Sequence, residues 1–241
     1  MTTSEEVLNF TNSYEKLRIL SYSYEENFEH YILKVLAAYK IDYKQFFSKL
    51  LFSIDPGTKQ IGIVIFLDDF FLLSHTIYDK REFIKYVKDK VECFQKNNPN
   101  LIMLEFKFGS GVLQIIKELI EELYVTYKNR GNLDISLIDE SKSSKMKNLT
   151  KKKRFKTKHE TAALILALRN GIKINQNNYY EILKQHIFQK SKSFRKTGED
   201  TEEFNDLKIK LRDIVDRLIN DEISLTKSSQ IIGQYKQNNL I

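Results

Sequence analysis

Hydrophobic residues recur at helical spacing near the start of the chain. The stretch "YEENFEHYILKVLAAYK", residues 24–40, has apolar residues that fall on one face of a helix, namely Phe28, Ile32, Val35, Leu36 and Tyr39. We therefore predict that residues 1–48 form a helical N-terminal extension.

From Lys49 the pattern changes to short apolar runs that are rich in β-branched and aromatic residues. The runs "LLFSI" and "IGIVIFL" flank the turn residues "DPGTKQ", and the run "FFLLSHTI" follows Asp68 and Asp69. Such runs with short connections predict a meander of three β-strands.

Helical and strand-like segments then alternate. We expect helices over "DKREFIKYVKDKVECFQKN", "SGVLQIIKELIEELYVTYKN" and "HETAALILALRNG", and strands over "NLIML" and "LDISLI". The order β-β-β-α-β-α-β-α predicts an α/β fold over residues 49–172, with a mixed sheet flanked by helices on both faces. An apolar stripe from Phe204 to Leu218 predicts that residues 173–241 form a helical C-terminal extension.

Carboxylates follow three of the predicted strands. Asp55 ends "LLFSI", Glu105 follows "NLIML", and Asp139 and Glu140 follow "LDISLI". Each acid alone suits a turn, but the carboxyl ends of parallel strands meet at one edge of a sheet, so we expect Asp55 and Glu105 on neighbouring strands. Clustered carboxylates repel each other, and a hard divalent cation relieves the repulsion. Oxygen ligands favour Mg²⁺ or Mn²⁺, and two such ions could activate a water for phosphodiester hydrolysis.

The composition predicts a globular protein with an anionic partner. Hydrophobic residues make up 41% of the 241 residues, which is enough for a packed core, and the net charge is +7. The longest apolar run, Ile61 to Leu67, is too short to span a bilayer, and the first residues do not resemble a secretory signal. The single cysteine, Cys93, excludes a cysteine-built zinc site and fits a reducing compartment, so we expect a cytoplasmic protein.

Nine cations and no acid lie between residues 142 and 158. A solvated loop is one interpretation of this segment. We favour binding to nucleic-acid phosphate, because a cationic cluster gains affinity by releasing condensed counterions. The residues expected to bind nucleic acid are Lys142, Lys145, Lys147, Lys151, Lys152, Lys153, Arg154, Lys156 and Lys158.

The stretch "SIDPGTKQIGIVIF" resembles the first-strand motif of the RuvC and YqgF branch of the ribonuclease H-like superfamily, with Asp55, Gly57 and Gly62 at the matching positions. Glu105, "IDESKSS" and "KHETAALILAL" are similar to the later motifs in the same order, over residues 50–172. The resemblance implies a ribonuclease H-like fold and a Mg²⁺- or Mn²⁺-dependent endonuclease. It also implies branched DNA as the substrate, with Holliday-junction resolution as the leading activity, and a homodimer.

The resemblance further suggests which residues form the site. Asp55 and Glu105 would be metal ligands, and His159 stands where many relatives carry an aspartate. Glu160 is the residue after His159, so the two side chains point about 100° apart on a regular helix. In order of preference, the candidate residues are Asp55 and Glu105, then Asp139 and His159, then Glu160 and Glu140.

Two other functions fit the same motifs. The Asp139-Glu140 pair favours a YqgF-like ribonuclease that acts in RNA processing. Ala162 stands where junction resolvases usually carry a second aspartate, which favours a non-catalytic nucleic-acid-binding protein that retains the fold.

Overall fold

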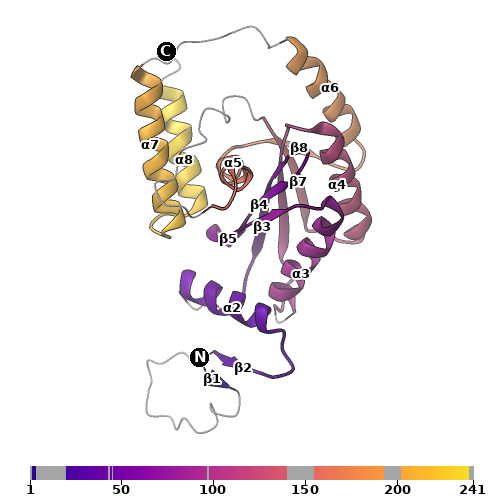
Figure 1. The fold of residues 1–241 in the computed structure, drawn as a ribbon, viewed down its shortest axis with the longest axis vertical. Coiled ribbons are helices and arrows are strands. Elements are labelled where there is room, and N and C mark those ends of the chain that lie inside the picture. Colours follow the sequence, from indigo (N-terminus) through magenta and orange to yellow (C-terminus); the bar gives the residue numbers. More distant parts are fainter. Residues whose placement is uncertain are drawn as a thin grey trace.

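The chain folds around a mixed six-stranded β-sheet with helices on both of its faces (Figure 1). This architecture confirms the predicted α/β class. The computed structural model describes residues 2–3, 20–42, 44, 46–96, 98–139, 155–192 and 202–238.

The strands of the large sheet lie in the order β5-β4-β3-β6-β7-β8. β3 pairs antiparallel with β4 and parallel with β6, β4 pairs antiparallel with β5, β7 runs parallel to β6, and β8 is antiparallel to β7. The predicted meander is confirmed as β3, β4 and β5. The strand bounds are β3 Lys49–Pro56, β4 Ile61–Leu67, β5 Phe70–Ile77, β6 Met103–Gly109, β7 Leu133–Ile138 and β8 Ile172–Ile174.

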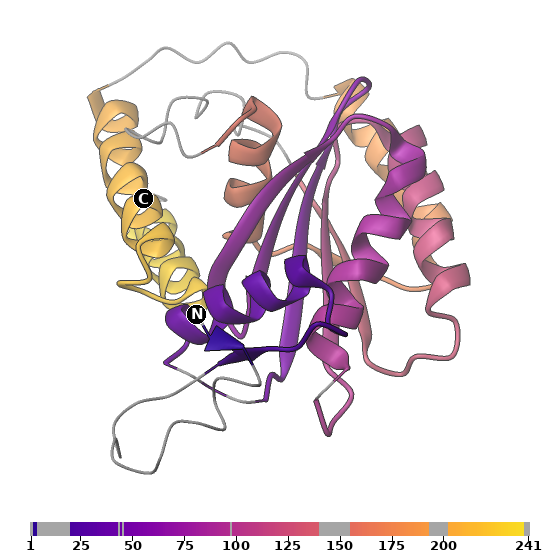
Figure 2. The same cartoon turned by 60° about the horizontal axis from the view of Figure 1, so that its bottom comes forward.

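Two layers of helices cover the sheet. Helices α3, α4 and α6 lie on one face, and α5, α7 and α8 lie on the other (Figures 1 and 2). The predicted helices after β5, β6 and β7 are confirmed as α3, α4 and α5. The helix bounds are α2 Phe28–Lys40, η1 Lys80–Glu82, α3 Phe83–Gln95, α4 Leu113–Thr126, α5 Lys158–Ala167, α6 Tyr179–Lys192, α7 Glu202–Ile219 and α8 Leu225–Asn238. Two short strands, β1 Thr2–Thr3 and β2 Ser21–Tyr22, pair separately.

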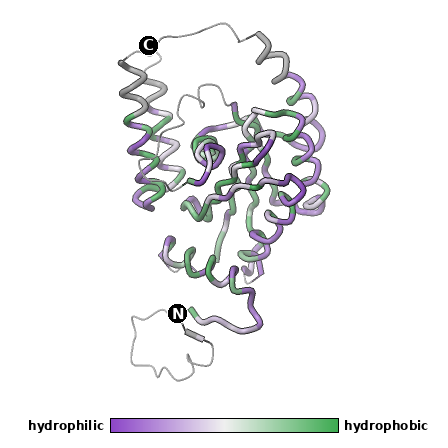
Figure 3. The backbone as a smooth tube through the Cα atoms, in the orientation of Figure 1, coloured by the Kyte–Doolittle hydropathy of each residue, from purple (hydrophilic) through white to green (hydrophobic). Residues whose placement is uncertain are grey.

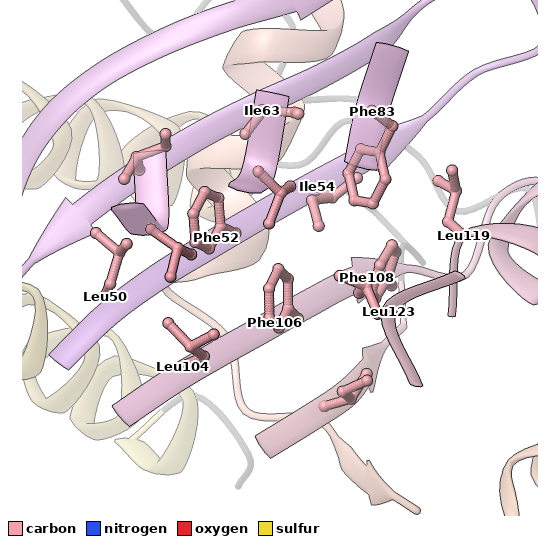
Figure 4. Packing of buried hydrophobic residues seen from close by; sticks show 14 of the residues in the cluster. Leu50, Phe52, Ile54, Ile63, Phe83, Leu104, Phe106, Phe108, Leu119 and Leu123 are labelled. Atoms are coloured by element: carbon pink, nitrogen blue, oxygen red, sulfur yellow. The ribbon is translucent and has the colours of Figure 1, made fainter. Parts of the chain in front are cut away.

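The central strand β3 contributes side chains to two hydrophobic cores. Phe52 and its alternate neighbours Leu50 and Ile54 face α3 and α4, where Phe52 stacks on Phe106 with ring centroids 5.0 Å apart (Figure 4). Leu51 faces the opposite way, towards α5 and the C-terminal helices. A strand that is covered on both faces is mostly apolar, which explains the hydrophobic run of β3 around Ser53. Figure 3 shows the hydrophobic residues concentrated in these central strands.

Helix α2 exists as predicted, and part of its apolar stripe is exposed. Tyr31, Ala37 and Ala38 are buried, whereas Phe28 and Tyr39 of the predicted apolar stripe are exposed. Small side chains let a helix approach its neighbours closely, and Ala37 lies in the core shared with the sheet. The apolar periodicity predicted the helix correctly, and Leu36 of the stripe packs against the core.

The terminal segments pack against the sheet domain. The Nζ atom of Lys40 in α2 lies 2.6 Å from the carboxylate of Asp221, which follows α7. Helices α7 and α8 share one core with α5 and β4. None of the helices in the described parts of the chain combines the length and the apolar composition that crossing a membrane requires.

Candidate active site

Asp55 and His159 meet at the carboxyl end of β3. Asp55 is the second-last residue of β3 and is buried, and His159 is the second residue of α5. The Nδ1 atom of His159 lies 2.6 Å from Oδ2 of Asp55, although the residues are 104 positions apart in the chain. An ionised carboxylate can only accept, so Nδ1–H is the donor in this contact, and Nε2 is an acceptor in the neutral form of the ring.

Two glycines allow this contact. Gly62 of β4 pairs with Asp55 in the sheet register, and the backbone of His159 lies directly over it. A Cβ atom at Gly62 would lie 2.2 Å from the carbonyl carbon of His159, and one at Gly57 would lie 2.6 Å from Cε1 of the imidazole. The first turn of α5 can therefore reach Asp55 only because neither position carries a side chain.

Helix α5 runs back along the sheet from this point. The hydroxyl of Ser53, two residues before Asp55 on the same face of β3, donates to the carbonyl of Ala163 at 2.6 Å. Lys107 of β6 donates through Nζ to the carbonyl of Ala167 at 2.8 Å, at the other end of the helix. Burial lowers the pKa of Lys107, and Glu105 opposes that shift. These contacts hold α5 along the sheet with its N-terminal end at Asp55.

Glu160 does not join the Asp55–His159 pair. Its carboxylate accepts from the hydroxyls of Ser74 at 2.7 Å and Thr76 at 2.5 Å, both on β5. It also accepts from the backbone N–H of Lys156 at 3.1 Å, while the Glu160 N–H donates to the side chain of the N-cap residue Thr157. This Thr-x-x-Glu arrangement resembles a capping box, and it anchors the start of α5 to β5.

Asp55 and Glu105 lie on neighbouring strands, as expected, but Glu105 lies inside β6, so its predicted place after the end of the strand is wrong. β6 continues to Gly109, and the parallel register pairs Glu105 with Leu51 of β3. The offset from Leu51 to Asp55 is four residues, which corresponds to about 13 Å along a strand. The Glu105 carboxylate instead lies 3.8 Å from Nζ of Lys49 and 3.9 Å from Nζ of Lys107.

The predicted end of this strand was wrong for a physical reason. Glu105 and Lys107 look like loop residues, but they alternate with Leu104, Phe106 and Phe108, which face the core on the other side of the sheet. The polar residues are accommodated on the α5 face, where Lys107 binds the end of the helix.

Asp139 lies at the same edge of the sheet as Asp55. β7 ends at Ile138, which pairs with Gly109 of β6, and Asp139 follows directly. β6 lies between β3 and β7, so the two backbones are about 10 Å apart. The backbone carbonyl of Asp139 accepts from Nη1 of Arg169 at 2.8 Å.

The basic segment and Glu140 fall mainly outside the described residues. Of the cations predicted to bind nucleic acid, Lys156 and Lys158 are described, and both are exposed next to His159. The residues outside the described part are Glu140, Lys142, Lys145, Lys147, Lys151, Lys152, Lys153 and Arg154.

Asp55 fits part of a metal coordination shell. Within the described residues, no group of three His, Cys, Asp or Glu side chains is placed to hold a metal ion. A hard divalent cation prefers oxygen, takes about six ligands and keeps several waters, so one carboxylate suffices for a partial protein shell. Asp139, at the same edge, is the nearest further candidate by strand register, and additional ligands would have to come from outside the described residues.

The sequence analysis did not identify the hydroxyl groups that hydrogen-bond to Glu160. Ser74 and Thr76 occupy alternate positions of β5, so both face α5. Two hydroxyls at this spacing in an apolar strand are the signal that could have indicated a buried polar partner.

The sequence matches no protein-family model, and no curated protein gives a significant match.

Proposed function

We propose that the protein is a metal-dependent endonuclease with a ribonuclease H-like fold, which hydrolyses phosphodiesters in branched DNA. The observation that carries the proposal is the contact between Asp55 at the end of β3 and His159 at the start of α5. The sheet order supports it, because a three-stranded meander is followed by two parallel strands joined through helices. The excess of positive charge supports a polyanionic substrate.

Each residue of the pair has a distinct role in this proposal. Oδ2 of Asp55 accepts the Nδ1–H of His159, which leaves Oδ1 as the oxygen that we assign to Mg²⁺ or Mn²⁺. When bound, such a cation neutralises phosphate charge and lowers the pKa of a coordinated water. His159 accepts a proton at Nε2, and Asp55 orients the imidazole and stabilises its charged form. Asp139 is a further ligand candidate, and a second ion would need ligands from beyond residue 139.

A cleavage assay with matched variants tests the proposal. We expect the protein to cut four-way DNA junctions in Mg²⁺ or Mn²⁺, and Asp55→Asn to abolish cutting. His159→Gln should lower the rate by about 10²- to 10⁴-fold, the usual contribution of a general base. Glu105→Gln is the control, because Glu105 lies four residues along the strand from Asp55, and it should leave substantial activity.

The substrate panel decides between this function and its alternatives. Preferential cutting of structured RNA would favour a YqgF-like ribonuclease. Binding of nucleic acid without cleavage of any substrate would favour a non-catalytic nucleic-acid-binding protein, the alternative that Ala162 suggests. A homodimer stays a prediction, which sedimentation equilibrium of the intact protein tests.

A further inference from the structure

A groove opens at the β3–β4 turn, which follows Asp55 in the chain. This cationic groove is lined by residues 57–61 of the turn, by residues 77–81 at the end of β5 and in η1, and by Ile115 of α4. Gly57 lines the groove and also lies against His159, because a Cβ atom at Gly57 would lie 2.6 Å from Cε1 of the imidazole. The groove therefore lies at the edge of the sheet that carries Asp55, on the α4 side of the β3–β4 turn.

The groove carries an excess of positive charge. Its lining contains Lys59, Lys80 and Arg81 but only one acid, Asp79. Arg81 pairs with Asp79 at 2.5 Å, and Lys80 pairs with Glu118. Ion pairs between such exposed side chains are worth only about 0–1 kcal/mol, so a phosphate can compete for these cations.

Lys59 and Tyr78 add to the binding capacity of the groove. Lys59, at the tip of the β3–β4 turn, is exposed and forms no ion pair with any residue that the structure describes. Ile61 pairs with Ile77, so the turn that holds Lys59 and the segment that holds Tyr78 extend from the same end of the β4–β5 pair. Tyr78 is 71% exposed, so its ring is accessible for stacking on a base.

We propose that the cationic groove binds one strand of the nucleic-acid substrate, next to the phosphodiester that is cut. Lys59, Lys80 and Arg81 contact its phosphates, and the ring of Tyr78 stacks on a base. Cations that follow a backbone together with an exposed aromatic ring are the means by which proteins hold a nucleic-acid strand without reading its sequence. This inference rests on the proposed function, because it takes the Asp55–His159 pair, at the same edge of the sheet, as the cleavage site.

A binding assay without catalysis tests the groove separately from the reaction. Fluorescence anisotropy of labelled oligonucleotides, both single-stranded and in four-way junctions, is measured in EDTA with Asp55→Asn as the parent protein. The triple variant Lys59→Gln/Lys80→Gln/Arg81→Gln should bind at least about tenfold more weakly. The slope of log Kd against the logarithm of the salt concentration should decrease by roughly 0.7–0.9 for each phosphate that the variant no longer neutralises. Tyr78→Ala should weaken single-strand binding by roughly tenfold and leave the salt slope unchanged.

A matched control removes the same charge elsewhere. Lys173, Lys184 and Lys227 are exposed and lie outside the groove, so the corresponding triple Gln variant should bind nearly as well as the parent. Three results would each overturn the groove proposal. They are equal losses of affinity in both triple variants, a groove variant that binds as tightly as the Asp55→Asn parent, and a parent that does not bind. If the groove variant loses binding while the wild type cuts nothing, the groove stands and the proposed cleavage function fails. Thermal unfolding of each variant verifies that it is folded.

Discussion

Gly62 lies under the first turn of α5, where a methyl group would come within 2.3 Å of the His159 carbonyl oxygen. Gly62→Ala should therefore push the helix start away from β4. We expect the free energy of unfolding to fall by about 1–3 kcal/mol, as for other overpacked sites, and DNA cleavage to fall more than stability alone explains.

Urea unfolding and the cleavage assay measure these two effects. Gly131→Ala is the matched control, because a Cβ at Gly131 would have no atom within 4 Å. If Gly62→Ala behaved like Gly131→Ala in both assays, the close approach of α5 to β4 would be wrong.

The role of Glu160 can be separated from that of a metal ligand. Its carboxylate is only 1% exposed and accepts from Ser74, Thr76 and the backbone of Lys156. Glu160→Gln should lower the free energy of unfolding by about 1–3 kcal/mol, because an amide cannot accept all of these hydrogen bonds. The Mg²⁺ concentration for half-maximal cleavage should not change. A large increase in that concentration with unchanged stability would instead identify Glu160 as a ligand.

At the scale of elements, the β4–β5 turn ties the end of β4 to the start of β3. Asp68 adopts a φ of 47°, and its carboxylate accepts from the backbone N–H groups of Ser48 and Lys49, from the Ser48 hydroxyl and from Lys44 Nζ. Burial raises the pKa of Asp68, but these hydrogen bonds together outweigh it and hold the pKa below its ordinary value of 3.8.

This turn predicts a pH dependence of stability. The pKa of Asp68 is lower in the folded state than in the unfolded state. The contribution of Asp68 to the free energy of unfolding is therefore complete above pH 3.8 and is lost as the pH falls through the lowered folded-state pKa. Asp68→Asn keeps a residue that tolerates the left-handed conformation but has no carboxylate. We expect the variant to be less stable near neutral pH and to lose less stability on acidification. Urea unfolding from pH 7 to pH 2 measures both, and parallel curves would contradict the assignment.

At the scale of the whole molecule, the C-terminal helices complete the layer that carries His159. Leu218 of α7 is completely buried in the core that also contains Leu164 and Ile165 of α5. Leu218→Ala should lower the free energy of unfolding by about 2–5 kcal/mol, because it leaves a cavity beneath the helix. Ile209→Ala on the same helix is the control, since Ile209 is 66% exposed and should change stability by no more than about 0.5 kcal/mol.

Two probes of unfolding test whether helices α7 and α8 unfold together with the sheet. If residues 173–241 were an independent unit, Leu218→Ala would lower the stability of α7 and α8 without changing the unfolding of the sheet. We expect one transition, monitored both by circular dichroism and by amide exchange in β3, to shift as a whole.

Local patterns predicted most of the elements but not how they meet. The apolar runs predicted the meander and the helices that follow it, because periodicity depends on neighbours along the chain. They also placed Asp55 at the end of its strand. They failed at Glu105, where alternation continued through two charged residues. In α2 they predicted the helix but did not identify Tyr31, Ala37 and Ala38 as its buried residues.

The sequence by itself therefore determined the α/β class, the order of strands and helices from β3 to α5, and an aspartate at the carboxyl end of a buried strand, but it did not predict β8. Only the tertiary structure decided that His159 joins Asp55, that Glu105 lies elsewhere and that Glu160 anchors α5. The physical reason is that these outcomes depend on the register between β3 and β6 and on the docking of α5 over Gly62. Both are contacts between residues that are far apart along the chain, and no local periodicity specifies them.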